Sequence, residues 1–85
     1  MQQLEQEIRH FVVDNFFFGE EKKDFSDDAS FFDTGVLDSM GVLTLVSFVQ
    51  EKYAIHVDDK DLVPDNFDSI RRVARFVHSK LNGQG

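Results

Sequence analysis

The chain has 85 residues, 41% of them hydrophobic, and a formal charge of −7 from 9 basic and 16 acidic side chains. This length suits one domain near the small end of what folds alone, and the acidic balance argues against nucleic-acid binding, which needs basic surface. Because there is no cysteine, an apolar core has to supply the stability without disulfides. No apolar run approaches the roughly 20 residues of a membrane span. Residues 1–5 lack the basic start of a signal peptide, so we expect a cytoplasmic protein.

The first predicted helix covers residues 2–18, where Leu4, Ile8 and Val12 recur at helical spacing. Gly19 then provides a stop. Residues 19–38 are predicted to form a long loop, and loops of this length in small domains are functional or packed by their own side chains. We expect apolar side chains to hold it to the core: Phe25, Phe31, Phe32, Val36 and Leu37.

The strongest apolar run predicts a second long helix at residues 39–53. Its apolar residues occupy more of the circumference than one core-facing stripe about 100° wide. The helix is therefore either central in a bundle, or it leaves apolar side chains exposed for a partner.

The rest of the chain predicts one short and one long helix. Residues 59–63 read as a short helix that ends before Pro64, because the residue before proline disfavours helix. Residues 65–69 read as a loop, with Asp68 or Ser69 capping a last helix at 69–81. Three long helices and one short helix without a sheet predict an all-α fold, a small four-helix bundle in a single domain spanning 1–85.

The segment 35–41, Gly-Val-Leu-Asp-Ser-Met-Gly, precedes the second long helix. Gly35 permits a sharp turn, and Asp38 and Ser39 are both helix-capping types. A hydroxyl there would lie at a helix N-terminus, where partial positive charge and free N–H donors suit a phosphate ester. An isolated Asp-Ser pair, however, is most often only a cap.

This motif, the apolar helix after it and the aspartate-rich loop beyond resemble the acyl, peptidyl and D-alanyl carrier proteins. The resemblance implies that Ser39 carries a 4'-phosphopantetheine arm, which a phosphopantetheinyl transferase moves from coenzyme A. The arm's thiol would hold an acyl or aminoacyl group as a thioester. An adenylating acyl or aminoacyl ligase would load it, and a downstream transferase or synthase would receive it. The chain itself would not be an enzyme, and the implied fold is a bundle of acyl-carrier-protein type.

The motif departs from the fatty-acid type of carrier, which resembles Asp-Ser-Leu followed by an acidic helix. Here Met40 replaces the leucine, and residues 39–53 are net neutral. The segment looks closer to D-alanyl carriers and freestanding aminoacyl or acyl carriers. We predict that a monomeric carrier docks its partners through apolar and shape contacts at Asp38, Met40, Leu43, Thr44 and Ser47.

The sequence gives little support for catalysis or metal binding by the chain itself. The three histidines, His10, His56 and His78, fit no hydrolase motif around a serine, so no catalytic residue is expected. The aspartate-rich stretches lack the alternating ligands and glycine of a calcium loop, so no metal is expected. One alternative is a helical protein-interaction module in which Ser39 is only a helix cap. A small acidic metal-binding domain is the weaker alternative.

Overall fold

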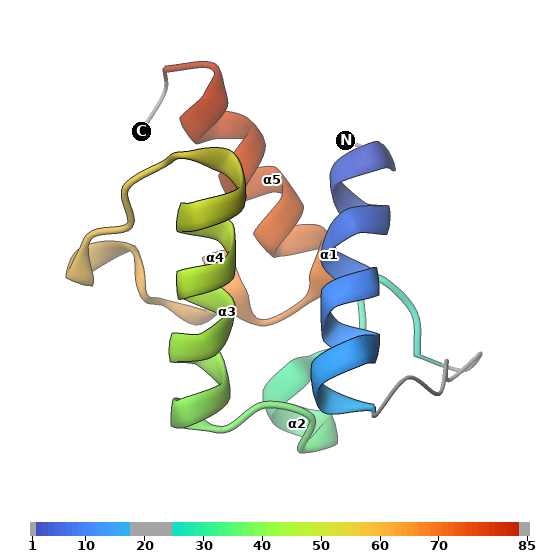
Figure 1. Cartoon of the computed structure of the whole chain (residues 1–85). Helices are drawn as coiled ribbons and strands as arrows, with labels where there is room; N and C mark the ends of the chain where they lie inside the picture. The colour runs from blue at the N-terminus through green and yellow to red at the C-terminus, as the bar shows by residue number, and fades with distance from the viewer. Residues whose placement is uncertain (1, 18–24, 84–85) are drawn as a thin grey trace.

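The computed structural model describes residues 2–17 and 25–83, and every regular element in these ranges is a helix (Figure 1). The elements are α1 (Gln2–Phe16), α2 (Phe31–Thr34), α3 (Ser39–Tyr53), the 3-10 helix η1 (Asp59–Asp61), α4 (Pro64–Phe67) and α5 (Ile70–Leu81). The long helices α1, α3 and α5 form the body, and the short elements lie in the connections between them. The predicted all-α fold class, a small helical bundle, is confirmed.

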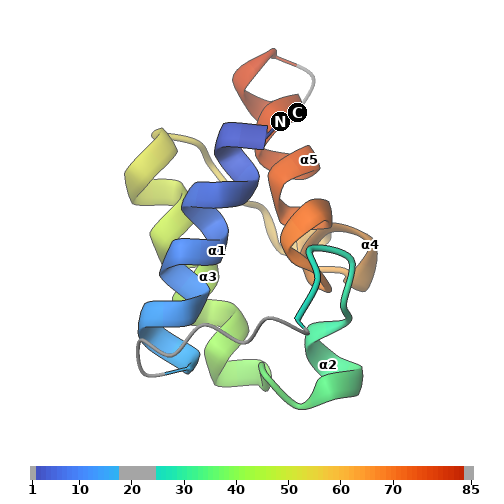
Figure 2. The same ribbon diagram turned by 90° about the vertical axis from the view of Figure 1, so that its right-hand side faces the viewer.

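Helices α1 and α3 lie antiparallel, so the C-terminal end of α1 lies beside the start of α3 (Figure 1). The Phe11 ring stacks on the Phe48 ring with centroids 4.0 Å apart, and the Tyr53 hydroxyl donates to Glu7 Oε1 at 2.7 Å. Figure 2 shows α5 and α4 beside this pair, with α2 at the end where α3 begins. The core contains fully buried side chains from all three long helices: Ile8, Val12, Leu45, Val49, Val73 and Val77.

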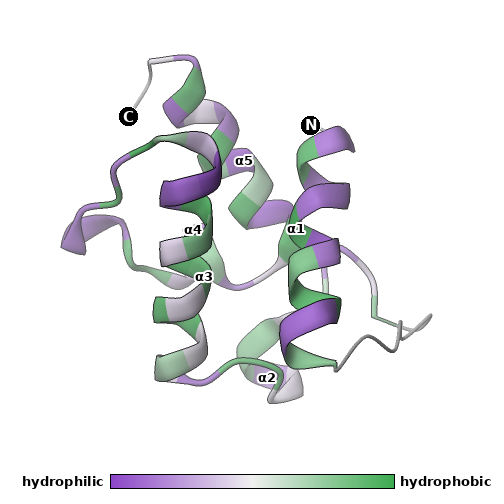
Figure 3. Cartoon of the chain, in the orientation of Figure 1, coloured by the Kyte–Doolittle hydropathy of each residue, from purple (hydrophilic) through white to green (hydrophobic). Residues whose placement is uncertain are grey.

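Helix α3 divides its surplus of apolar residues between the core and the surface. Leu45, Val46 and Val49 are buried, whereas Met40 is 71% and Leu43 53% exposed. In Figure 3 the strongly hydrophilic part of α3 is confined to its C-terminal end. Of the two alternatives posed by the apolar run, the structure supports exposed apolar side chains near the start of the helix.

The predicted loop at 19–38 contains a helix that the sequence analysis missed. Ser30 caps α2, since its Oγ accepts the Asp33 N–H at 3.0 Å, and Gly35 ends it in the left-handed conformation at φ +75°. Of the expected anchors, Phe25, Phe31 and Leu37 are buried and Val36 is partly buried. The prediction for Phe32 was wrong: its ring is 44% exposed, because a four-residue helix buries only one of two adjacent phenylalanines.

The predictions around Pro64 also need correction. The expected short helix at 59–63 is only the 3-10 turn η1, and residues 65–67 of the expected loop at 65–69 belong to α4. Pro64 begins α4, a favourable position because the first residue of a helix has no intrahelical use for its N–H. Helix α1 ends at Phe16, short of the predicted residue 18, which lies outside the described residues together with Gly19.

Candidate functional site

The chain enters α3 through a short segment tied to α2. The Phe31 carbonyl accepts the N–H groups of Val36 and Leu37 at 2.9 and 3.3 Å. The side chains of Phe31 and Leu37 are both buried, at 0% and 3% exposure. These contacts fix the backbone immediately before Ser39.

Asp68 holds α2 in place by hydrogen bonds, although it lies far from α2 in the sequence. Its Oδ2 accepts the Ser30 hydroxyl at 2.7 Å, its Oδ1 accepts the Phe32 N–H at 3.1 Å, and its carbonyl accepts the Phe31 N–H at 2.7 Å. Ser69, not Asp68, caps α5, since its Oγ accepts the Arg72 N–H at 3.1 Å. The sequence left Asp68 and Ser69 as alternative caps of α5, and no local pattern connects Asp68 with Ser30, 38 residues earlier.

Asp38 is the N-cap of α3, and Ser39 is the first residue of the helix. Asp38 Oδ1 accepts the Gly41 N–H at 2.9 Å, the interaction expected of an N-cap side chain. Ser39 is exposed, and the described part of the chain provides no hydrogen-bond partner for its hydroxyl. The cap role that the interaction-module alternative gave to Ser39 is therefore wrong, because Asp38 holds that role.

The backbone around this hydroxyl suits a phosphate ester. The first N–H groups of a helix have no intrahelical acceptor. Asp38 satisfies the N–H of Gly41, and the described residues offer no acceptor for those of Ser39 and Met40. Both donors and the positive end of the helix dipole thus remain available to a phosphodiester on Ser39 Oγ. The 4'-phosphopantetheine group implied by the sequence motif fits this position.

The first turn of α3 is packed closely against its neighbours at Gly41, which is buried. A Cβ at this position would lie 2.9 Å from Leu37 Cδ2 and 3.3 Å from Phe16 Cε1. The first distance is shorter than carbon atoms tolerate, so glycine allows α3 to begin directly against both side chains. The start of the helix, and Ser39 with it, is held by the core.

The residues predicted to dock partners follow Ser39 along one exposed face of α3. Met40, Leu43, Thr44 and Ser47 have the spacing of a single helix face, and all four are exposed. Thr44 Oγ1 donates back to the Met40 carbonyl at 3.2 Å, so its methyl group adds to the apolar surface. The structure therefore brings these side chains together beside Asp38 and Ser39.

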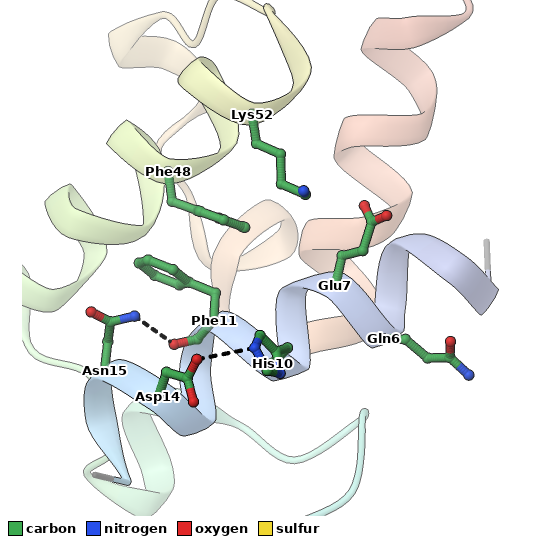
Figure 4. Close-up of a pocket in the computed structure, with 8 residues that line it drawn as sticks. All are labelled: Gln6, Glu7, His10, Phe11, Asp14, Asn15, Phe48 and Lys52. Atoms are coloured by element: carbon green, nitrogen blue, oxygen red, sulfur yellow. Dashed lines mark hydrogen bonds and ion pairs between the residues drawn. The ribbon is translucent and has the colours of Figure 1, made fainter. Parts of the chain in front are cut away.

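A groove of about 320 Å³ lies between α1 and the C-terminal half of α3 (Figure 4). The stacked rings of Phe11 and Phe48 face each other within it, with Lys52 and Glu7 toward one end. Phe48 lies nine residues after Ser39, about 13 Å farther along the helix axis and on the opposite side. The groove is thus separate from the surface around Ser39.

The side-chain partners of the three histidines do not include Ser39. His10 pairs with Asp14 at 3.1 Å, His56 with Asp58 at 2.7 Å, and His78 lies 3.1 Å from Asn82 Nδ2. Within residues 2–17 and 25–83, no group of three His, Cys, Asp or Glu side chains is arranged to hold a metal ion. Over the same ranges, no helix is long and apolar enough to cross a membrane.

Residues 17–77 match the family model of the phosphopantetheine attachment site. The chain belongs to this family of carriers. A search of curated proteins gave no match to the chain. The match covers the start of α3, the exposed serine and the elements that support them, and it confirms the carrier family predicted from the motif.

A carrier of this family binds 4'-phosphopantetheine covalently and is not itself an enzyme. The partners of such a carrier are the phosphopantetheinyl transferase that attaches the arm and biosynthetic enzymes that use it. The chemistry expected of the chain is thus to present a hydroxyl for attachment and to offer a surface to these enzymes.

Proposed function

We propose that Ser39 is the residue to which the 4'-phosphopantetheine arm is attached. One observation carries the proposal: Asp38 caps α3, which leaves the exposed hydroxyl of Ser39 without a structural role at a helix N-terminus. The Ser39 Oγ would become the ester oxygen of a phosphodiester, and the N–H groups of Ser39 and Met40 would face its negative charge. When attached, the arm supplies a thiol that holds an acyl or aminoacyl group as a thioester.

The attachment is tested by intact mass after incubation with coenzyme A and a broad-specificity phosphopantetheinyl transferase. The parent chain should gain one phosphopantetheine group, and Ser39→Ala should gain none. Ser26→Ala is the matched control, because Ser26 is an exposed serine outside α3 and outside the proposed docking face. Loading retained in Ser39→Ala, or lost in Ser26→Ala, would overturn the assignment.

The proposal extends to the class of cargo and the loading enzyme. The Gly-Val-Leu-Asp-Ser-Met-Gly segment and the neutral character of α3 support a carrier of the D-alanyl or freestanding aminoacyl type. An adenylating acyl or aminoacyl ligase would load the arm, and a downstream transferase or synthase would accept the cargo. We also propose that the carrier is monomeric and cytoplasmic, and sedimentation of the purified chain tests its oligomeric state.

We further propose that Asp38, Met40, Leu43, Thr44 and Ser47 form the docking face for these enzymes. Its support is the exposure of two large apolar side chains there, with the two charged residues of α3 near the other end of the helix. An exposed apolar group buried by a partner contributes strongly when it lies at the centre of the interface.

Leu43→Ala tests this face against Leu81→Ala, because the two leucines are 53% and 52% exposed but lie on different helices. We expect Leu43→Ala to lower kcat/KM for arm attachment by about tenfold and Leu81→Ala to leave it unchanged. Equal effects of the two substitutions, or an effect only of neutralising Asp38 and Glu51, would contradict docking through apolar contacts.

A further inference from the structure

A polar cavity of about 370 Å³ lies where α5 faces η1 and α4. Its charged lining is Arg72, Arg75 and Lys80 from α5 and Asp61 from η1. Three cations thus converge on one concave surface with a single carboxylate, in a chain with a formal charge of −7. The side chains of Asn66, Phe76 and Ser79 complete the lining.

The cations are brought together by helical spacing. Arg72, Arg75 and Lys80 are separated by three and five residues, and with Phe76 and Ser79 they occupy one side of α5. The structure therefore places two guanidinium groups and one ammonium group on the same side of a regular helix, a rigid support.

The two arginines carry charge that the described residues leave largely uncompensated. Arg75 is exposed and has no ion pair with any residue in 2–17 or 25–83. Arg72 Nη1 lies 3.6 Å from Asp65 Oδ1, but the Asp65 side chain is 95% exposed, so water screens this pair. Arg72 also donates to the Pro64 carbonyl at 3.3 Å, which holds its side chain toward α4.

The carboxylate of Asp61 is already occupied by other partners. Asp61 Oδ2 accepts the Asp58 N–H at 3.1 Å and lies 3.4 Å from Lys80 Nζ. The side chains of Asp61 and Lys80 are both largely buried. The hydrogen bond from the Asp58 N–H is the main reason that the pKa of Asp61 is lowered, and the interaction with Lys80 lowers it further. Asp61 therefore stays ionised. Lys80 in turn lies 5.5 Å from the centre of the Phe76 ring. The Asp61–Lys80 pair therefore adds no net charge to the cavity, and the two arginines give the cavity its positive charge.

We propose that this cavity binds the phosphate groups of a small phosphorylated molecule. Arginine presents its N–H donors in a fork that matches phosphate oxygens, and two such groups on one surface can bind the two phosphates of a diphosphate. The Asn66 amide and the Ser79 hydroxyl add neutral donors that a multidentate phosphate can use. The site does not involve Ser39 and is independent of the arm.

Titration of the unmodified chain with inorganic pyrophosphate, at constant ionic strength, tests the proposal. The expected result is saturable binding by calorimetry, with NMR shifts centred on the Nε–H groups of Arg72 and Arg75. Arg75→Gln should weaken binding by about tenfold or more, since a hydrogen bond to a charged group is lost. Arg75 is exposed and glutamine is a good helix former, so the variant should fold, as its melting temperature will check.

Lys52→Gln is the matched control, because it removes the same charge from an exposed position on α3 outside the cavity. An equal loss of affinity in Lys52→Gln would mean nonspecific attraction and overturn the site, as would the absence of saturable binding. Citrate provides the second arm, since it carries similar charge on carboxylates. Binding of citrate as tight as that of pyrophosphate would overturn the assignment to phosphate, whereas at least tenfold weaker binding would support it.

Discussion

Replacement of Asp38 tests how Ser39 is presented at the start of α3. The Asp38 side chain accepts the Gly41 N–H at 2.9 Å, and Asp38→Ala leaves that donor without its cap. Loss of an N-cap costs about 1 kcal/mol. For a domain of this size, each kcal/mol lowers the melting temperature by about 4–8 °C. We therefore expect Asp38→Ala to melt about 4–8 °C below the parent when unfolding is followed by far-ultraviolet circular dichroism.

Two further variants separate the hydrogen bond from the charge. Asp38→Asn keeps an oxygen that can cap Gly41 and loses only the charge–dipole interaction, which for this exposed side chain is about 0.3 kcal/mol, so it should melt between Asp38→Ala and the parent. Glu51→Ala removes an exposed acid from the same helix, and its stability should stay within about 0.5 kcal/mol of the parent. An Asp38→Ala variant that melts with the parent, or an Asn variant that melts as low as the Ala variant, would refute the capping role.

Three other substitutions probe contacts of α2 and α3 with their neighbours. Gly41→Ala gains up to about 1 kcal/mol of helix propensity, but its Cβ 2.9 Å from Leu37 Cδ2 costs about 1–3 kcal/mol, so urea unfolding should show a net loss and not a gain. Asp68→Ala removes two side-chain hydrogen bonds to α2, and hydrogen exchange should quicken at residues 31–37 while the middle of α1 is unchanged. The hydrogen bond from the Tyr53 hydroxyl lowers the pKa of Glu7 in the folded protein. This bond therefore stabilises the fold fully at pH values above the ordinary glutamate pKa of about 4.3. The stabilisation is lost as the pH falls through the lowered pKa of Glu7. The stability gap between the parent and Tyr53→Phe should therefore be about 1 kcal/mol at neutral pH and narrow in acid; a gap independent of pH would contradict this reasoning.

The long helices were predictable because their signals are local and periodic. The apolar run at residues 39–53 corresponds to α3, with the same first and last residues, since an aspartate cap and a long apolar segment define both ends in the sequence itself. The last helix is similar: the spacing of Ile70, Val73 and Val77 indicates the face that the structure buries.

The short elements were not predictable in the same way. Helix α2 has four residues, too few for a periodic pattern, and it depends on Asp68, which lies 38 residues after Ser30 in the sequence. The start of α4 at Pro64 reads equally well as a helix end, because proline follows helices as well as beginning them. The division of roles between Asp38 and Ser39 also needed the structure, since both residue types favour the cap position.

The location of the arm on the chain is the most direct test of the account. After loading with coenzyme A and a phosphopantetheinyl transferase, the chain is digested, and peptide fragmentation identifies the modified residue. The account predicts that the phosphopantetheine group lies on Ser39, in the peptide that also contains Asp38 and Met40. Its presence on another residue, such as Ser47, with Ser39 unmodified, would contradict the central claim that the first residue of α3 is presented for attachment.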